Sequence, residues 1–300
     1  MNVHNQTSIS ASVLGKLAAE LIANRQNASI MGVTSRGSFI KTDTRWLFFL
    51  SNEAYRGPLT VNFATGIPAK LNMHAPVHLQ DREITIPDAQ LTIMTGTAEI
   101  WQPTSPSLSS VDQQGIQSRL IEFQQSVMRK KPDVKLARLL EALTGQSELK
   151  AKNDQPAASL REKIRRLSLK VKHKDWDKVT PSVAGLLGAG SGLTPSGDDF
   201  AIGFLLTLNR WMTNQIDPEY LAELNATITA AAYKNTTILS ANLIECAAQG
   251  LADERLIDGI DALITDTPKP ELAIKALLTW GNSSGVDALV GMTVALSIFE

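Results

Sequence analysis

The chain has 300 residues, of which 43% are hydrophobic and 20% charged, and its formal net charge at pH 7 is -1. This composition is typical of a globular protein with a large core and excludes a disordered chain. A near-neutral balance argues against a protein that binds nucleic acid or a membrane surface, because both need a basic surplus. The single cysteine, Cys246, excludes a disulfide framework or a thiolate metal cluster within one chain. Residues 1–12 do not resemble a signal peptide and no apolar run is long enough to span a membrane, so we expect a cytoplasmic protein.

The first predicted element is a short amphipathic helix over Ile9–Asn24, because apolar residues recur there at helical spacing. From about Ala28 the period changes to short β-branched or aromatic segments separated by Gly, Pro, Asn and Asp. These segments are Ile30–Val33, Trp46–Leu50, Leu59–Phe63, Glu83–Ile86 and Leu91–Met94. They predict a compact β region that ends near Trp101.

A Pro/Ser-rich loop at 103–110 separates this region from a remainder that is almost entirely helical in pattern. Helices are predicted at about 111–130, 134–145, 157–171, 198–212, 218–234, 237–251, 253–264, 270–279 and 285–299. The sequence therefore predicts an α+β protein. Its mostly β N-terminal domain, with the leading helix, covers 1–102, and an all-helical domain covers 103–300.

Two features carry positive charge. The segment Lys150–Lys178 is rich in Lys and Arg, and we expect a solvated helix face there rather than an anion-binding or partner-docking surface. Arg36 and Arg56 each precede a glycine, where the guanidinium could bind a carboxylate or phosphate through two hydrogen bonds. A plain surface position is the default expectation for both arginines.

The most informative segment is the glycine- and serine-rich run from Gly188 to Asp199, which an apolar stretch follows at once. Ser196, with Asp199 three residues later, resembles a capping box and predicts that a helix begins there. Gly188, Gly190 and Gly192 permit positive φ and let a ligand approach the main chain. The unsatisfied N–H groups and positive dipole end of a helix start suit a phosphate or a carboxylate.

A second segment, Gly281–Gly291, repeats the pattern. Aligned on serine, Ser196–Gly203 and Ser284–Gly291 both read S-G-x-D-x-x-x-G at the start of a hydrophobic helix. A glycine inside a helix costs about 1 kcal/mol relative to alanine, so we expect close helix packing at Gly203 and Gly291 to compensate. If these two faces cross, both helix starts converge on one pocket. The hydroxyl donors there are Thr194, Ser196, Ser283 and Ser284.

A single Ser-Gly-x-Asp start is explained by capping alone, whereas two copies and an extra acid, Asp198, favour a functional site. Asp198 can orient a substrate N–H, act as a general base or help to hold a divalent cation, and the sequence does not choose between these roles. We expect catalytic roles for Ser196, Asp198 and Asp199. The predicted substrate- or phosphate-binding residues are Gly190, Ser191, Gly192, Thr194, Gly197, Ser283, Ser284, Gly285, Asp287 and Arg56. No cluster of metal ligands is predicted, and Mg²⁺ is the one cofactor left open.

These segments resemble a known family. Gly192–Asp199 and Gly281–Asp287 resemble the two signature segments of the AllH family. Thr236–Gly250 resembles its middle helix and Arg56–Asn62 a segment of its N-terminal part, so we expect the resemblance to run over most of the chain. The chain departs from the family at Asn282, where histidine is frequent.

The resemblance implies a subunit of oxamate carbamoyltransferase, which moves a carbamoyl group between oxalurate and phosphate in the anaerobic breakdown of purine ureides such as allantoin. It also implies FdrA-like and other partner subunits in a hetero-oligomer. It does not say which subunit holds the chemistry. A non-catalytic assembly subunit and an ATP- or phosphate-binding enzyme with another substrate therefore stay open. Phosphate, carbamoyl phosphate and oxamate are all anions that suit helix N-termini.

Other motifs fit less well. Gly281–Gly285 matches the G-x-S-x-G pattern of serine hydrolases, but the preceding residues have a helical pattern and no histidine follows Ser283. The glycine-rich loop lacks the Gly-Lys-Ser/Thr ending of a P-loop. His74 and His78 flank Pro76, which rules out a metal-binding pair on a regular helix, so we expect surface or core histidines.

Overall fold

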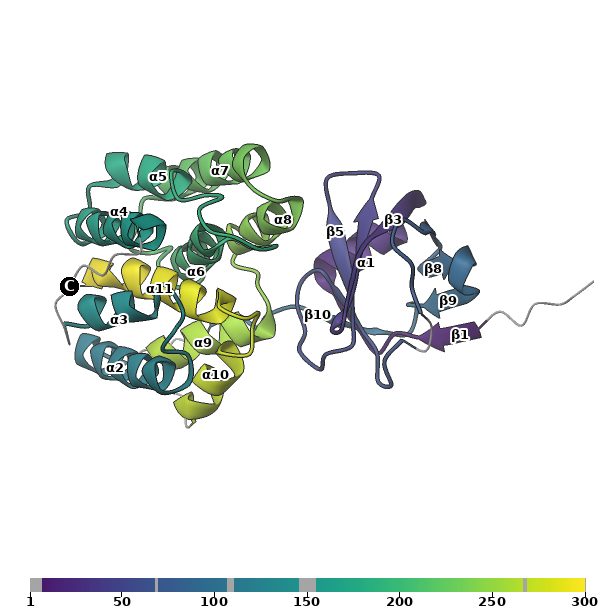
Figure 1. The fold of residues 1–300 in the computed structure, drawn as a ribbon, viewed down its shortest axis with the longest axis horizontal. Coiled ribbons are helices and arrows are strands. Elements are labelled where there is room, and N and C mark those ends of the chain that lie inside the picture. The colour runs from purple at the N-terminus through teal and green to yellow at the C-terminus, as the bar shows by residue number, and fades with distance from the viewer. Residues whose placement is uncertain (1–6, 68–69, 107–110, 146–154, 267–268, 300) are drawn as a thin grey trace, which may run out of the picture. The chain divides into compact units, whose positions relative to one another are not determined.

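The computed structural model describes residues 7–67, 70–106, 111–145, 155–266 and 269–299. The chain divides into two compact units, Met1–Pro103 and Thr104–Glu300. Among the described residues, every strand lies in the first unit and ten of the eleven α-helices lie in the second (Figure 1). The α+β fold class is therefore confirmed.

One curled ten-stranded sheet forms the first unit, in the spatial order β1-β9-β8-β7-β3-β4-β5-β6-β2-β10. Neighbouring strands are antiparallel except for the pairs β1–β9, β5–β6 and β2–β10, which are parallel. The strands are β1 (Thr7–Ser10), β2 (Val13–Gly15), β3 (Gln26–Thr34), β4 (Gly37–Thr42), β5 (Leu47–Ser51), β6 (Thr60–Asn62), β7 (Pro76–Gln80), β8 (Glu83–Ile86), β9 (Leu91–Met94) and β10 (Glu99–Trp101). A short 3-10 helix, η1 (Pro87–Ala89), connects β8 to β9.

The sheet buries one face because its side chains alternate. In β7, Val77 and Leu79 are buried while Pro76, His78 and Gln80 are exposed, which is the period of two that a half-buried strand requires. Helix α1 (Lys16–Ala23) adds its buried face to this core, which draws all its members from the first unit.

The predicted helix over Ile9–Asn24 is wrong in its first half. Residues 7–10 form β1 and residues 13–15 form β2, and the helix begins only at Lys16. Val13 and Leu14 recur at helical spacing, but they pair with β6 on one side and β10 on the other. Sheet pairing over a long sequence distance overrides a local periodicity that fits either structure.

The second unit is helical, as predicted. Its helices are α2 (Gln113–Lys130), α3 (Ala137–Leu143), α4 (Gln155–Lys172), α5 (Trp176–Ala184), α6 (Ser196–Trp211), α7 (Pro218–Asn235), α8 (Ile238–Ala247), α9 (Glu254–Ile264), α10 (Pro270–Leu277) and α11 (Ser284–Leu296), followed by the 3-10 helix η2 (Ser297–Phe299). Only α5 was not predicted. It contains Pro181, which removes one helical hydrogen bond, and its buried Val179 and Val183 hold it in the core.

Helices α6 and α11 are the centre of this unit (Figure 1). From Gly197 to Leu208 in α6, and along all of α11, every residue is buried. A helix that is buried on all sides needs a cover of other helices, and the remaining helices of the unit supply it. The buried thiol of Cys246 lies in this unit too.

The charged face of α4 is solvated, as predicted. Glu162 pairs with Arg165 and Arg166 on the surface of that helix. The part of the basic segment at 150–154, like the end of the Pro/Ser loop at 107–110, lies outside the described residues. No helix in the described ranges is both long and apolar enough for a membrane crossing.

Candidate functional site

The two Ser-Gly-x-Asp segments begin helices where the sequence predicted. Helix α6 begins at Ser196 and α11 at Ser284. The predicted capping box at Ser196 is wrong, because Pro195 occupies the N-cap and no side chain there bonds a backbone N–H. The serine and aspartate side chains of each start instead face the other helix, which is a tertiary contact that local capping rules do not anticipate.

Glycines allow the two helices to pack backbone against backbone. A Cβ on Gly203 would lie 2.0 Å from the carbonyl oxygen of Ala288, and a Cβ on Gly291 would lie 2.0 Å from that of Phe200. Both distances are far below van der Waals contact, so only glycine fits. The prediction of close helix packing at Gly203 and Gly291 is confirmed.

The contacts between the two starts are reciprocal. Gly203 of α6 meets Ala288, and the equivalent Gly291 of α11 meets Phe200, which is the position equivalent to Ala288. The glycines after each serine behave alike: a Cβ on Gly197 would lie 1.9 Å from the Leu186 carbonyl oxygen, and a Cβ on Gly285 would lie 2.0 Å from that of Leu277. The two segments therefore form a pseudo-twofold pair with their N-termini side by side.

Asp199 of α6 is buried beside the start of α11. Thr194 Oγ1 donates to Asp199 Oδ2 at 3.3 Å and lies 3.2 Å from Ser284 Oγ. Burial raises the pKa of Asp199 to about 8. The hydroxyls of Ser284 and Thr194 lower this pKa, and the nearby Asp287 carboxylate raises it.

Asp287 of α11 occupies the equivalent place beside the start of α6. Burial raises its pKa to about 7, while the hydroxyls of Ser196 and Ser283 and the charge of Lys135 lower it. The two serine hydroxyls are close to Asp287 but do not meet hydrogen-bond geometry. Both Asp287 carboxylate oxygens, and Oδ1 of Asp199, are buried without a hydrogen-bond partner in the described protein.

Asp198, the acid that the sequence singled out, has a different environment. Its Oδ1 accepts a hydrogen bond of 2.7 Å from the backbone N–H of Gly188, and its Oδ2 accepts one from the hydroxyl of Thr236. It is fully buried. Asp198 thus ties the start of the glycine-rich loop to the end of α7, and the two carboxylates with spare oxygens are Asp199 and Asp287.

The glycine-rich loop presents its backbone to solvent. Gly188, Gly190 and Gly192 have φ of 76°, 125° and 105°, the left-handed region that the sequence predicted for them. The hydroxyls of Thr237 and Ser240 fix the loop by donating to the Leu193 carbonyl oxygen, at 2.7 and 3.5 Å.

Ser191, Gly192 and Leu193 are exposed on this loop. Within the described ranges, the N–H groups of residues 190–194 donate no hydrogen bond to the protein. They are the amide donors that an anion could use.

Basic side chains that the sequence did not single out lie by the second start. Lys131 Nζ donates to the Asn282 carbonyl oxygen at 2.9 Å, and Lys135 is close enough to Asp287 to lower its pKa. Both follow α2 in the chain and are distant in sequence from Asn282, so no local pattern could have revealed them.

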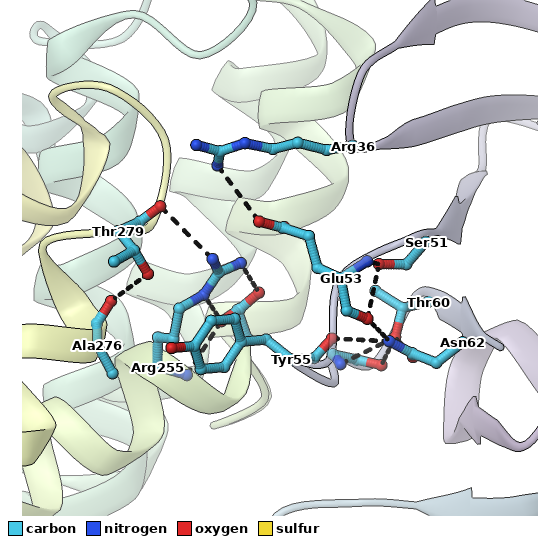
Figure 2. Close-up of polar contacts among 11 residues, drawn as sticks. Arg36, Ser51, Glu53, Tyr55, Thr60, Asn62, Arg255, Ala276 and Thr279 are labelled. Atoms are coloured by element: carbon cyan, nitrogen blue, oxygen red, sulfur yellow. Dashed lines mark hydrogen bonds and ion pairs between the residues drawn. The ribbon is translucent and has the colours of Figure 1, made fainter. Parts of the chain in front are cut away.

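The loop before the second start is fixed by a buried arginine. Arg255 forms a two-point ion pair with Asp253, at 2.8 Å for each hydrogen bond, and its Nη1 reaches the Thr279 carbonyl oxygen at 3.5 Å (Figure 2). Thr279 Oγ1 donates to the Ala276 carbonyl oxygen, which closes the end of α10. These contacts set where the chain enters Gly281 and α11.

Arg56 belongs to the N-terminal unit. Its guanidinium lies over the Trp101 ring, 5.7 Å from the ring centroid. The segment that carries it is ordered by Asn62, whose Nδ2 donates to the carbonyl oxygens of Glu53 and Tyr55 at 3.0 and 2.8 Å (Figure 2). The structure brings together the predicted residues of the two helix starts, whereas Arg56 belongs to the other unit.

Neither a metal site at His74 and His78 nor a serine-hydrolase site at Ser283 gains support. His78 is exposed on β7 and pairs with Asn27 at 3.1 Å, and His74 lies in a turn with a φ of 65°. The described part of the chain contains no group of three or more His, Cys, Asp or Glu side chains that could hold a metal ion. Ser283 has α10 and a turn before it, not the strand of a nucleophile elbow.

The fold and the paired starts define a class of protein: an α+β chain whose helical unit joins two glycine-packed helices by an acidic, hydroxyl-rich cluster. Residues 186–296 match the model of the AllH family, described as oxamate carbamoyltransferase subunit AllH. The resemblance predicted from the two signature segments is confirmed over these residues. The match covers α6 to α11 and does not reach Arg56–Asn62, so the expectation that it runs over most of the chain is wrong. No solved structure matches the chain.

Proposed function

We propose that the chain is a subunit of a carbamoyltransferase that acts on oxamate or oxalurate with carbamoyl phosphate or phosphate, or on a closely related small anion. The site proposed is the paired start of α6 and α11 with the loop at 190–194. The observation that carries it is the reciprocal packing of the two Ser-Gly-x-Asp starts, which the family segment contains in full.

The chemistry fits this site in two respects. Two helix N-termini and the free N–H groups of the loop suit the phosphate or carboxylate of every substrate named. Transfer of a carbamoyl group to or from an amide nitrogen requires a proton to leave or join that nitrogen. A carboxyl group with a pKa of about 8, like that of Asp199, is a suitable proton acceptor near neutral pH.

The proposed roles follow from position. Asp199 accepts or returns the proton, with Thr194 and Ser284 as its hydroxyl neighbours, and Ser196 lies beside Asp287 of the other start. Gly190, Ser191, Gly192 and Thr194 bind the anion from the loop. Asp198 positions that loop and is not proposed to touch substrate.

One observation favours the rival function, a non-catalytic assembly subunit. Asp198, Asp199 and Asp287 are all completely shielded from solvent, as side chains of a purely structural helix junction would be. Under this alternative the loop and the N-terminal unit serve FdrA-like partners. A cytoplasmic location and a role in purine catabolism stay predictions from the sequence.

Calorimetric titration of the full chain with oxamate, phosphate and carbamoyl phosphate tests the proposal. We expect binding of at least one of these anions, and its loss in Ser196→Ala and in Asp199→Asn. Asp133→Asn is the matched control, because Asp133 is an exposed carboxylate of the same unit. Absence of binding in the wild-type chain, both alone and mixed with its partner subunits, would favour the assembly role.

A further inference from the structure

The buried carboxylates at the paired starts present an electrostatic problem. Asp199 and Asp287 lie at the first turns of α6 and α11 and are both completely shielded from water. Two ionised carboxylates in such a place repel each other and lose their hydration, which costs several kcal/mol unless a partner compensates. The hydroxyls around them supply too few hydrogen bonds, because three of the four carboxylate oxygens have none.

The helix ends do not balance this charge. Each helix N-terminus carries roughly +0.5 elementary charge, so two of them offset about half of the charge of two carboxylates. Lys135 is exposed and contributes from the edge of the cluster. When both carboxylates are ionised, a net charge of about -1 remains in a volume that water does not reach, so either protons or a bound cation must neutralise it.

The donors around this charge are all oxygen atoms. Besides the three free carboxylate oxygens, the hydroxyls of Ser196 and Ser283 lie beside Asp287, and those of Thr194 and Ser284 lie beside Asp199. In the described residues this cluster contains no histidine and no thiol. Carboxylate and hydroxyl oxygens suit hard cations, and Mg²⁺ in particular is usually held by one or two carboxylates together with substrate oxygens.

We propose that Asp199 and Asp287 jointly hold one divalent, oxygen-preferring cation, Mg²⁺ or Mn²⁺, between the first turns of α6 and α11. A cation displaces the protons from both carboxylates and changes the charge of the doubly ionised site from about -1 to about +1, which makes the paired starts attractive to a small anion. The cation site stands without the proposed function. Its use as a bridge to a phosphate or carboxylate group rests on that function.

The test uses the full chain, freed of metal with EDTA and titrated with Mn²⁺ while electron paramagnetic resonance follows the free ion. We expect one bound Mn²⁺ per chain, displaced by Mg²⁺. Loss of an outer partner of a metal ligand typically costs 10- to 100-fold in affinity, so Asp199→Asn and Asp287→Asn should each weaken binding by about 100-fold or more. Asp133→Asn should bind like the wild type.

No binding of Mn²⁺ by the wild type, or wild-type affinity in both asparagine variants, overturns the proposal. A second measurement covers the case in which those variants do not fold. Substoichiometric Mn²⁺ should broaden the amide NMR signals of the first turns of α6 and α11, at 197–199 and 285–287, before those of the rest of the wild-type chain. Broadening that begins elsewhere also overturns it.

Anion titrations with and without Mg²⁺ separate this inference from the proposed function. Cation binding without any binding of oxamate, phosphate or carbamoyl phosphate keeps the cation site and removes the function. Anion binding that is indifferent to Mg²⁺ keeps the function and removes the bridging role.

Discussion

Burial of Asp199 and Asp287 has a consequence for the pH dependence of stability. Their pKa values are raised in the folded state to about 8 and about 7, from 3.8, because burial disfavours the charged form. The folded chain thus binds protons more tightly than the unfolded one. The stabilisation is fully present below about pH 4 and is lost as pH rises through 7 and 8.

We therefore expect the metal-free chain, kept in EDTA, to lose unfolding free energy between pH 5.5 and 8.5. Asp287→Asn cannot ionise and should lose less over the same range, by on the order of 1 kcal/mol. Urea unfolding at several pH values measures both. Parallel pH profiles of Asp287→Asn and the wild type would contradict this expectation.

Asp198 illustrates a carboxylate with the opposite role. It accepts hydrogen bonds from Gly188 N–H and Thr236, so Asp198→Ala leaves both donors of these part-buried hydrogen bonds without an acceptor. We expect a loss of about 2–4 kcal/mol in unfolding free energy. Asp198→Asn keeps an acceptor for the N–H and a group that can pair with the hydroxyl, and should cost much less. Thermal and urea unfolding compare the two, and equal losses would mean that the hydrogen bonds are not what Asp198 contributes.

At the scale of elements, the close approach of α6 and α11 is the feature on which the site depends. A Cβ on Gly203 would collide with the backbone of Ala288, which cannot move aside as a side chain can. We expect Gly203→Ala to destabilise the chain by about 3 kcal/mol or more and to separate the two helix starts.

Gly259→Ala is the matched control for this prediction. Gly259 also lies inside a helix, α9, but its Cβ would meet the flexible end of the Leu277 side chain at 3.2 Å. Alanine there gains about 1 kcal/mol of helix propensity, which offsets the crowding. Denaturant unfolding of both variants distinguishes them, and similar stabilities would show that α6 and α11 do not pack so closely.

At the scale of the whole molecule, the two units have separate cores. The buried cluster of the helical unit runs from Ile116 to Ile298, and that of the sheet unit from Ala11 to Ile93. We expect residues 104–300, expressed alone, to fold cooperatively and to give a helical circular dichroism spectrum. A fragment that lacks a cooperative thermal transition would show that the helical unit depends on the first unit.

The family segment of residues 186–296 lies wholly within that fragment. If the fragment folds, it should keep the Mn²⁺ binding of the full chain, since Asp199 and Asp287 both belong to it. Arg56 does not, so any contribution of that arginine to anion binding would appear as a difference between fragment and full chain.

The sequence by itself determined the fold class, the two helix starts and the close packing at Gly203 and Gly291. These features have local causes. The hydrophobic period and the positions of glycine and proline indicate the elements, and the glycines inside the repeated helical motif indicate close packing because glycine destabilises a helix. It also suggested the family, because the two signature segments are contiguous in the chain.

Only the tertiary structure distinguishes the contacts of Asp198 from those of Asp199. Asp198 and Asp199 are adjacent and alike in sequence, yet one bonds the loop at Gly188 and the other faces Asp287. The residues Val13 and Leu14 became strand rather than helix for a similar reason, since their partners lie far along the chain. Burial, pairing and the loss of hydration depend on which residues lie nearby in space. Local sequence patterns do not give those neighbours, because folding brings together residues that are far apart in the chain.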